Sequence, residues 1–225
     1  MKSIMITGAG SGLGKELALL FSQKGYHLLL IGRHVEKIAT TQKEIEALGG
    51  KANIFALDIQ NAEQVMNTVQ EICSRFKIVG LVNNAGVGHF GTFLDMEEQQ
   101  MTEMLNTNIL GTLMMTKATL PQLLKSPEGF ILNIISTAGL RGKVNEAVYC
   151  TSKFALKGFT ESLQKEFEGT PIKIKAVYMG GMDTPFWAGS DHVKDSSRFR
   201  SPQEVAKMIF EQMDQNSIVI ESKKS

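Results

Sequence analysis

The beginning of the chain joins a short apolar run directly to a cluster of glycines and then to an amphipathic segment. Residues 3–7 read SIMIT, and the next residues read GAGSGLGKEL. Glycines between a strand and a helix let the backbone bend sharply and approach a pyrophosphate, which binds the free N–H groups of the helix start. The spacing is T-G-x-x-x-G-x-G, with Leu13 where the G-x-G-x-x-G pattern has its third glycine. This context predicts a dinucleotide-binding turn; the alternative is a glycine-rich turn that binds nothing.

The rest of the chain alternates short apolar runs with longer amphipathic segments. The apolar runs predict strands at residues 3–7, 26–32, 52–57, 78–84, 129–136, 172–179 and 217–221. The amphipathic segments predict helices at residues 12–24, 35–48, 61–75, 97–105, 107–124, 147–167 and 203–213. The first strands are nearly continuous in Val, Ile and Leu, as expected when both faces are covered. Repeated strand–helix alternation therefore predicts an α/β fold, a doubly wound parallel sheet in a single domain.

One long irregular segment interrupts this alternation. Residues 185–200 read PFWAGSDHVKDSSRFR, and a loop of this length in a compact domain is often a lid over a site. Its aromatic residues, Phe186, Trp187 and Phe199, either pack in the core or cover an apolar substrate. The following SPQE predicts a helix start, with Ser201 as the cap and Pro202 in the first turn.

Composition and charge exclude several classes of function. The 225 residues carry a formal net charge of +1 and show no basic arm or acidic tail, so we expect neither nucleic acid nor an anionic membrane as a partner. The start is too short for a signal-peptide core, and no later run approaches a membrane span. Two cysteines without metal-type spacing predict no metal site and fit a reducing compartment. We therefore expect a cytoplasmic protein.

The end of the second predicted strand indicates which dinucleotide would bind. A carboxylate there accepts from a ribose 2′-hydroxyl, whereas this chain has Gly32, Arg33 and His34. Arg33 offers a positive charge and a fork of donors that suits a phosphate. The sequence predicts NADP(H) over NAD(H), and the alternative is a solvated surface arginine.

Three further motifs complete a pattern. NNAG occupies residues 83–86, Ser136 closes a predicted strand in IIS, and YCTSK occupies residues 149–153. Together with TGAGSGLG, in this order, they make the chain resemble the short-chain dehydrogenase/reductase family from residue 3 to about residue 210. The resemblance implies a Rossmann-type doubly wound sheet, with residues 1–225 as one NAD(P)-binding domain and a substrate lid near 185–200. It also implies hydride transfer between a nicotinamide and an alcohol or carbonyl carbon.

The resemblance also assigns positions to the cofactor. Asp58 would contact the adenine ring, although an Asp after a strand is also a good helix cap. VYMGGMDTPF departs from the family's P-G-x-x-x-T because Met179 replaces the proline, which puts the rigidity of this loop in question. The predicted cofactor-binding residues are Thr7, Gly8, Ser11, Gly12, Leu13, Gly14, Arg33, Asp58, Ile59, Asn84, Ala85, Gly86, Tyr149, Lys153, Gly180, Met182 and Thr184.

The predicted catalytic residues are Asn108, Ser136, Tyr149 and Lys153. Tyrosine, with a pKa of about 10, is a poor acid or base near neutrality, and an adjacent cation lowers that pKa. Lys153 lies one helical turn after Tyr149, so we expect it to lower the pKa of Tyr149 by roughly two to three units. By resemblance, Ser136 would polarise the substrate carbonyl, and Asn108, rather than Asn106, would complete a proton route through water to Lys153.

The sequence thus predicts an NADP(H)-dependent oxidoreductase that interconverts a small carbonyl compound and an alcohol. A nucleotide-binding redox sensor or scaffold without turnover is the alternative. An epimerase or dehydratase is a further one, but such relatives usually carry a larger carboxyl-terminal region. His89 and His192 are expected at the surface or against substrate. The family commonly pairs through the helices predicted at 107–124 and 147–167, which implies a homodimer or homotetramer.

Overall fold

A parallel sheet forms the centre of the computed structural model, which describes residues 1–188 and 190–222. Within these residues the sheet has seven strands in the order β3-β2-β1-β4-β5-β6-β7, and every neighbouring pair is parallel. The predicted strands agree with the observed ones to within two residues at each end. The strands are β1 (Lys2–Thr7), β2 (His27–Gly32), β3 (Lys51–Ala56), β4 (Lys77–Asn83), β5 (Phe130–Ile134), β6 (Lys173–Met179) and β7 (Ser217–Ile220).

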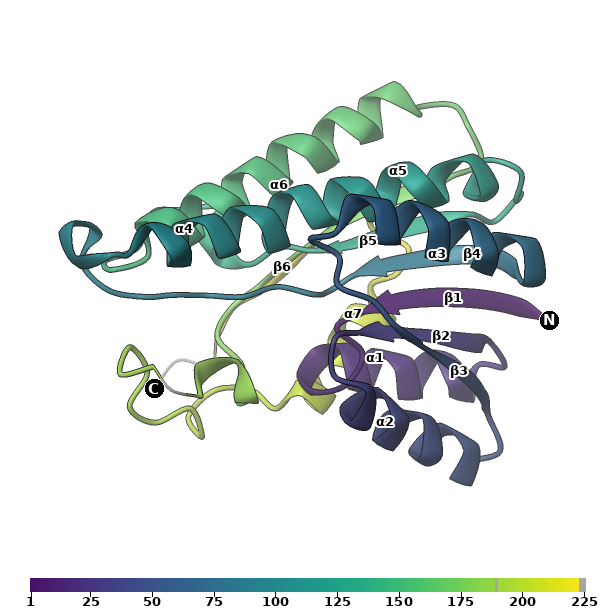
Figure 1. Cartoon of the computed structure of the whole chain (residues 1–225), viewed down its shortest axis with the longest axis horizontal. Helices are drawn as coiled ribbons and strands as arrows, with labels where there is room; N and C mark the ends of the chain where they lie inside the picture. The colour runs from purple at the N-terminus through teal and green to yellow at the C-terminus, as the bar shows by residue number, and fades with distance from the viewer. Residues whose placement is uncertain (189, 223–225) are drawn as a thin grey trace.

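Helices cover both faces of the sheet, so the predicted doubly wound α/β fold is confirmed. In Figure 1, α3, α4, α5 and α6 lie on one face and α1, α2 and α7 on the other. The helices are α1 (Gly12–Gln23), α2 (Val35–Ala47), α3 (Ala62–Arg75), α4 (Glu98–Met104), α5 (Thr112–Leu123), α6 (Ala147–Glu166) and α7 (Pro202–Glu211). Short 3₁₀ segments are η1 (Phe93–Asp95), η3 (Thr137–Gly139) and η4 (Pro185–Trp187).

The central strands bury alternate residues under the two helical layers. Ile4 and Ile6 of β1 pack in the cluster that includes residues of α1 and α7, whereas Met5 packs in the cluster that includes residues of α3 and α5. Side chains of a strand alternate between its faces, and a strand covered on both faces must therefore be apolar throughout. This explains why the strand sequences are nearly continuous in apolar residues.

The link between α4 and α5 differs from the prediction. The sequence indicated separate helices at 97–105 and 107–124, but a π-helical segment, η2 (Leu105–Gly111), joins α4 to α5 without a break. π-Helical turns inside α-helices are rare and frequently occur at functional sites. Here the segment contains the fully buried Asn108, whose contacts are described below.

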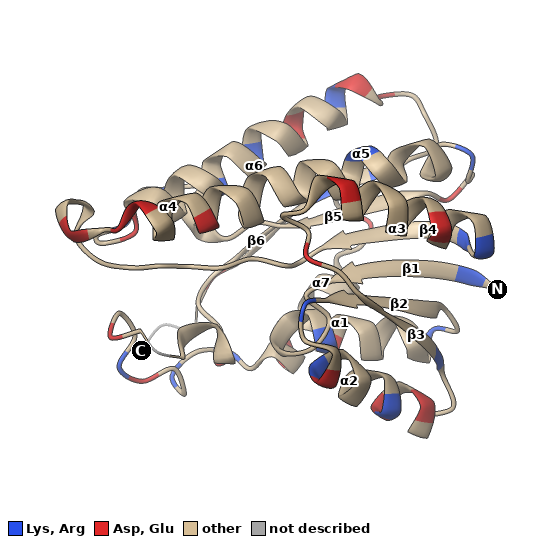
Figure 2. Cartoon of the chain, in the orientation of Figure 1, with Lys and Arg blue, Asp and Glu red and all other residues tan. Residues whose placement is uncertain are grey.

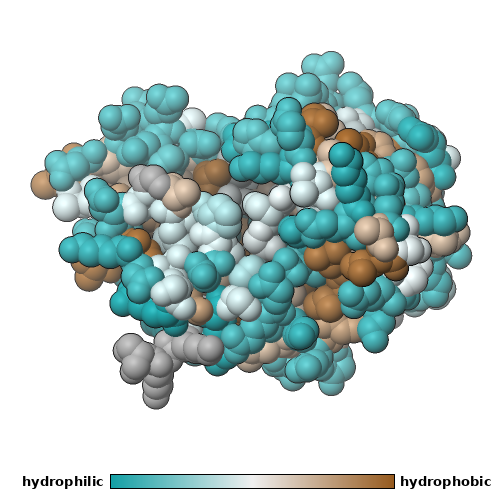
Figure 3. All heavy atoms as spheres, turned by 90° about the horizontal axis from the view of Figure 1, so that it is seen from below, coloured by the Kyte–Doolittle hydropathy of each residue, from teal (hydrophilic) through white to brown (hydrophobic). Residues whose placement is uncertain are grey.

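Charged residues of both signs are distributed over the helices and loops (Figure 2). Figure 3 shows the molecule from below, relative to Figure 1. Hydrophilic residues cover most of this face, with a few hydrophobic patches between them. Among the described residues, no helix combines the length and the apolar character needed to cross a membrane.

Candidate active site

A long cleft opens at the carboxyl ends of the strands. From β1 the chain adds β2 and β3 on one side, whereas β4 and the later strands lie on the other side of β1, so the strand order reverses between β1 and β4. Such switch points leave a crevice in which open α/β sheets bind ligands. The predicted residues that line the cleft are Gly8, Ser11, Gly12, Leu13, Arg33, Asp58, Ile59, Asn84, Ala85, Gly86, Ser136, Tyr149, Lys153, Gly180, Met182 and Thr184.

The glycine turn has a shape that side chains would prevent. Gly8 and Gly12 have positive φ angles of 66° and 52°, which glycine adopts without a steric penalty. A Cβ on Gly14 would collide with the carbonyl oxygen of Gly8 and with the side chain of Asn84. Ser11, the N-cap of α1, makes no side-chain capping hydrogen bond. The N–H groups of the first turn of α1 therefore face the cleft without a side-chain cap.

Thr7 and Asn84 hold this turn against the end of β4. The Thr7 hydroxyl accepts hydrogen bonds from the backbone N–H groups of Asn84 and Ala85, both at 3.0 Å. The Asn84 amide donates to the backbone carbonyls of Thr7 and Gly8 at 3.0 and 3.2 Å. Thr7 and Gly14 thus shape the cleft from behind instead of lining it.

Asp58 follows β3 and lines the cleft. The alternative prediction, that Asp58 caps the next helix, is wrong. Its Oδ1 accepts from the backbone N–H of Gln60 at 3.0 Å. The N-cap of α3 is Asn61, whose side chain accepts from Gln64 N–H at 3.0 Å. Asp58 therefore forms a turn on the cleft wall and leaves capping to Asn61.

Arg33 is half-exposed at the end of β2 and faces an acidic group on the opposite wall. Its Nη1 lies 3.8 Å from Oε1 of Glu103 in α4, and Oε2 of the same carboxylate lies 2.8 Å from Nε2 of His89. Lys37 and His34 also line this end of the cleft. Sequence reasoning missed Lys37, although a cation four residues after Arg33 at a helix start was a usable signal.

Tyr149, Lys153 and Ser136 meet at the other end of the cleft. Tyr149 and Lys153 are 6% and 5% exposed, and the Lys153 ammonium lies 5.6 Å from the centroid of the Tyr149 ring. Lys153 Nζ also donates to the carbonyl of Ile134 at 3.4 Å. Burial lowers the pKa of Lys153 from its ordinary value of 10.5 to about 8, because the charged form loses hydration.

The prediction that Lys153 lowers the pKa of Tyr149 is wrong for the protein chain alone, without a bound cofactor. Burial raises the pKa of Tyr149 above its ordinary value of 10.0 because the phenolate would lose hydration. A hydrogen bond with the Ser136 side chain opposes this rise, and the charge of Glu146 adds to it. The tyrosine hydroxyl therefore keeps its proton at neutral pH.

Ser136 has an unusual backbone conformation. Its φ of 149° and ψ of 156° lie in a region that is populated almost only by glycine. The Ser136 hydroxyl accepts from the backbone N–H of Ala138 at 3.1 Å, which fixes the side chain at the start of η3. Strained residues of this kind cluster at active sites, where the surrounding structure holds them in place.

Asn108 is buried behind the cleft and makes three hydrogen bonds. Its Oδ1 accepts from Val87 N–H at 2.8 Å, and its amide donates to the Val87 carbonyl at 2.9 Å and to the Ser152 hydroxyl at 3.0 Å. Asn108 therefore connects the segment that follows β4, at Val87, to helix α6. A Cβ on Gly86 would lie 3.2 Å from Asn108 Oδ1 and 3.6 Å from Lys153 Nζ, so both groups approach the backbone of this segment.

The loop after β6 is held in place without the proline that the family pattern has. Gly180 N–H donates to the Ile220 carbonyl at 2.7 Å, and Gly181 N–H donates to Ser222 Oγ at 2.9 Å. The carbonyl of Met182 accepts from the Trp187 indole at 2.8 Å. Pairing with the end of β7 thus supplies the restraint that Met179 cannot.

Residues of the 185–200 segment close the cleft beside Tyr149 with aromatic rings. Phe90, in the connection after β4, lies with its ring centroid 5.3 Å from Trp187, 4.7 Å from His192 and 5.4 Å from Tyr149. Phe186 lies 5.9 Å from Tyr149. Phe186 and Trp187 therefore line the cleft, whereas Phe199 packs against the Trp187 ring with centroids 6.0 Å apart.

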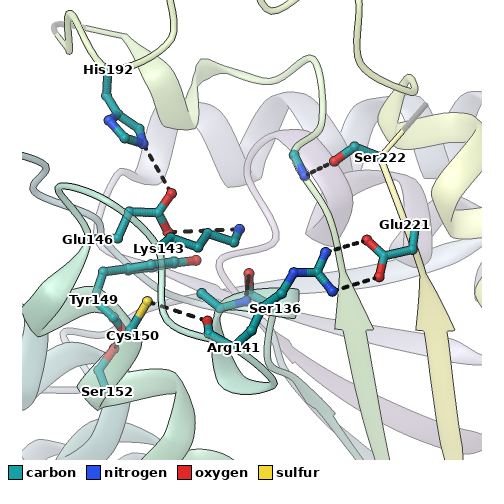
Figure 4. A network of polar contacts seen from close by, with 12 residues as sticks. Ser136, Arg141, Lys143, Glu146, Tyr149, Cys150, Ser152, His192, Glu221 and Ser222 are labelled. Atoms are coloured by element: carbon teal, nitrogen blue, oxygen red, sulfur yellow. Dashed lines mark hydrogen bonds and ion pairs between the residues drawn. The ribbon is translucent and has the colours of Figure 1, made fainter. Parts of the chain in front are cut away.

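Two charged residues at this end were missed by sequence reasoning. Lys143 and Glu146 line the cleft just before α6, and Glu146 contacts His192 of the 185–200 segment (Figure 4). No local pattern could have indicated this contact, since its two residues are far apart in the chain.

The residues of the cleft fit a nicotinamide dinucleotide. The turn around Gly8 and Gly12 leaves no room for side chains and exposes the helix start, as a pyrophosphate requires. The cleft continues from there to Tyr149 and Lys153, so one extended ligand can reach both ends.

Known proteins are similar to this chain in sequence and in fold. The family model described as short chain dehydrogenase matches residues 2–194. The 3-oxoacyl-(acyl-carrier-protein) reductase FabG of Thermotoga maritima is 31% identical over 228 residues, which cover 97% of this chain and 93% of that protein.

Solved structures agree with this match. An alcohol dehydrogenase from the archaeon Thermococcus sibiricus, complexed with 5-hydroxy-NADP, is 27% identical with a TM-score of 0.87, covering 98% of this chain and 94% of that one. A short chain dehydrogenase/reductase from Burkholderia phymatum, in complex with NAD, is 23% identical with a TM-score of 0.87, covering 98% and 88%. The chain belongs to the short-chain dehydrogenase/reductase family of oxidoreductases.

Proposed function

We propose that this protein is an NADP(H)-dependent oxidoreductase that interconverts a carbonyl compound and an alcohol. The observation that carries the proposal is one continuous cleft, with the glycine turn at one end and Tyr149, Lys153 and Ser136 at the other. A protein that only sensed or stored a nucleotide would have little use for a buried phenol, ammonium and hydroxyl at the second end.

The protonated Tyr149 hydroxyl favours the reduction of a carbonyl compound over the oxidation of an alcohol, because reduction needs a proton donor. A bound nicotinamide would supply the hydride. The Tyr149 hydroxyl, which burial keeps protonated, would give its proton to the carbonyl oxygen as that oxygen gains negative charge. Ser136 would donate a hydrogen bond to the same oxygen. Lys153 would hold the nicotinamide ribose, and with Asn108 behind it would return a proton to Tyr149 through water.

Arg33 supports NADP(H) over NAD(H). A guanidinium at the end of β2 can bind a 2′-phosphate through paired hydrogen bonds. Lys37 and His34 line the same end of the cleft and would strengthen the positive potential there. The relatives described above were solved with either an NADP derivative or NAD. The preference is therefore proposed from the residues of this chain.

The residues that line the substrate half of the cleft favour a flat carbonyl compound as the substrate. Phe186, Trp187 and Tyr149 present ring faces and edges to it. Aromatic walls favour planar apolar groups, which stack on rings or meet their edges. The 185–200 segment would act as the lid of this half.

The test is turnover of carbonyl compounds with NADPH, followed by the absorbance of the reduced nicotinamide. We expect the wild type to reduce flat aldehydes or ketones and Tyr149→Phe to lose about a hundred- to ten-thousandfold in kcat. NADPH binding, measured by calorimetry, should stay near the wild-type value. Tyr178→Phe removes a buried phenol outside the cleft and is the matched control. Substantial turnover by Tyr149→Phe would refute the acid role, and absence of turnover with tight NADPH binding would favour the sensor.

The oligomeric state stays a prediction. Leu110, Leu124 and Phe154 are exposed apolar residues on or beside the two helices through which the family commonly pairs. Their exposure supports a homodimer or homotetramer.

A further inference from the structure

Glu146 is a buried carboxylate that has no part in the proposed hydride and proton transfers. It precedes Tyr149 by three residues, lines the cleft and is only 6% exposed. Its backbone carbonyl accepts from Cys150 N–H at 2.7 Å, so it stands at the first turn of α6. A buried carboxylate is costly unless charged or hydrogen-bonding partners compensate for lost hydration. The partners of Glu146 therefore indicate why it is there.

Each carboxylate oxygen of Glu146 faces a different basic side chain. Oε1 lies 3.0 Å from Nε2 of His192, and Oε2 lies 3.8 Å from Nζ of Lys143. In Figure 4 dashed lines join Glu146 to His192 and to Lys143, and both cleft-lining residues come just before α6. The carboxylate thus stands between the lid segment and a cation that borders the reacting end of the cleft.

His192 is fixed on a second side by an aromatic contact. Its ring stacks on Phe90 with centroids 4.7 Å apart and planes 16° apart. Phe90 in turn meets the Tyr149 ring edge to face at 5.4 Å. Glu146 and Phe90 together hold His192 over the substrate half of the cleft.

Beside the ammonium of Lys153, which stays the same in every variant below, this end of the cleft is lined by one further cation and one carboxylate that offset each other. Lys143 brings a positive charge to the cleft, and Glu146 brings a negative charge beside it. An anion entering next to the tyrosine hydroxyl would be attracted by Lys143 and repelled by Glu146. At about 6 Å and an effective dielectric constant of about 20, one unit charge changes the affinity for an anion by roughly a hundredfold. Because solvent screening and side-chain movement reduce this effect, we expect about tenfold at the site.

We infer that Glu146 determines the charge preference of the substrate half of the cleft. By pairing with Lys143 and His192 it offsets the positive charge of Lys143, so the cleft accepts uncharged flat carbonyl compounds and discriminates against those that carry a carboxylate. The inference rests on the proposed function. Glu146 acts through Lys143 and is a specificity-determining residue, and it takes no proton in the reaction.

The first experiment uses two aldehydes of similar shape and different charge. 4-Nitrobenzaldehyde is neutral, and 4-carboxybenzaldehyde is an anion at neutral pH. We expect the wild type to favour the neutral probe in kcat/KM with NADPH. Glu146→Gln should raise kcat/KM for 4-carboxybenzaldehyde about tenfold, mainly through KM, and change the neutral probe less than threefold. Adding Lys143→Met should abolish the gain.

Two control variants separate this effect from general damage to the fold. Glu146→Asp keeps the charge and should keep the preference of the wild type. Glu161→Gln neutralises an exposed carboxylate on the same helix, far along from the cleft, and should change neither probe. An equal change for both probes in Glu146→Gln, or a gain that persists without Lys143, would overturn the inference.

A binding measurement keeps this test separate from the proposed function. Trp187 is the only tryptophan of the chain and lines the same half of the cleft, so its emission reports occupancy there. Titration with 4-nitrobenzyl alcohol and 4-carboxybenzyl alcohol gives dissociation constants without turnover. We expect Glu146→Gln to bind the anionic alcohol about tenfold more tightly. If no variant turns over either aldehyde, the proposed reaction fails for this substrate class, and the dissociation constants still decide the role of Glu146.

Discussion

The buried ammonium of Lys153 should make the stability of the fold depend on pH in a defined direction. Its folded-state pKa is about 8 and its ordinary value is 10.5. Below pH 8 the folded and unfolded chains both carry the proton, and the folded chain bears the cost of burying the charge. Between pH 8 and 10.5 the folded chain has released the proton while the unfolded chain keeps it. Raising the pH through this window therefore stabilises the folded chain.

The two pKa values set the size of this effect. Their difference of about 2.5 corresponds to about 3 kcal/mol, at about 1.4 kcal/mol for each pKa unit. Lys153→Met removes the titrating group and keeps a side chain of similar length. The free energy of unfolding of the wild type should therefore rise by about 2 kcal/mol relative to Lys153→Met between pH 7 and pH 9.5.

Urea denaturation followed by circular dichroism, repeated across this pH range, measures the difference between the two proteins. Lys157→Met lies one turn further along α6 with a partly exposed side chain and controls for the substitution itself. Parallel pH profiles for the wild type and Lys153→Met would refute the view that burial dominates the pKa of Lys153. A difference that falls with rising pH would show that a buried negative partner outweighs burial.

Two further predictions concern the cofactor half of the cleft. Arg33→Ala should raise the dissociation constant for NADPH about tenfold to a hundredfold, because one or two charge-assisted hydrogen bonds are lost. The dissociation constant for NADH should stay nearly unchanged. Calorimetric titration with both cofactors measures this, and equal losses would contradict the assignment. Gly14→Ala should lower the thermal midpoint by several degrees, because its Cβ would collide with the Gly8 carbonyl oxygen and overpacking typically costs about 1–3 kcal/mol. Gly158→Ala, where nothing lies within 4 Å of an added Cβ, should be neutral or stabilising in the same melting experiment; similar losses in both would show that packing at the turn is not responsible.

Most of the fold could be predicted from the sequence because its determinants are local. Most strands are short, largely apolar runs bounded by polar or glycine residues, and most helices have apolar residues at helical spacing. Even the short seventh strand was predicted, at residues 217–221, and it is observed at Ser217–Ile220. The π-helical turn at Leu105–Gly111 could not, because the bonds of Asn108 to Val87 and Ser152 come from other elements.

The candidate site divides in the same way. The glycine turn and the Tyr149–Lys153 pair each lie within a few residues, so their spacing alone indicated a phosphate cradle and a phenol beside an ammonium. Glu146 carries no such signal. Its relation to His192 spans 46 positions in the chain and exists only because the 185–200 segment folds over the cleft. The same holds for Glu103, which meets Arg33 across the cleft.

The sequence by itself determined which groups stand one helical turn apart in this protein, but not how much water surrounds them. The spacing of Tyr149 and Lys153 placed an ammonium beside a phenol, and this proximity was expected to lower the pKa of Tyr149. Only the tertiary structure decided the direction, since the elements packed around Tyr149, with Phe90 and Phe186 against its ring, bury it and raise its pKa. Hydration depends on every element that packs around a group, and a local pattern cannot contain that information.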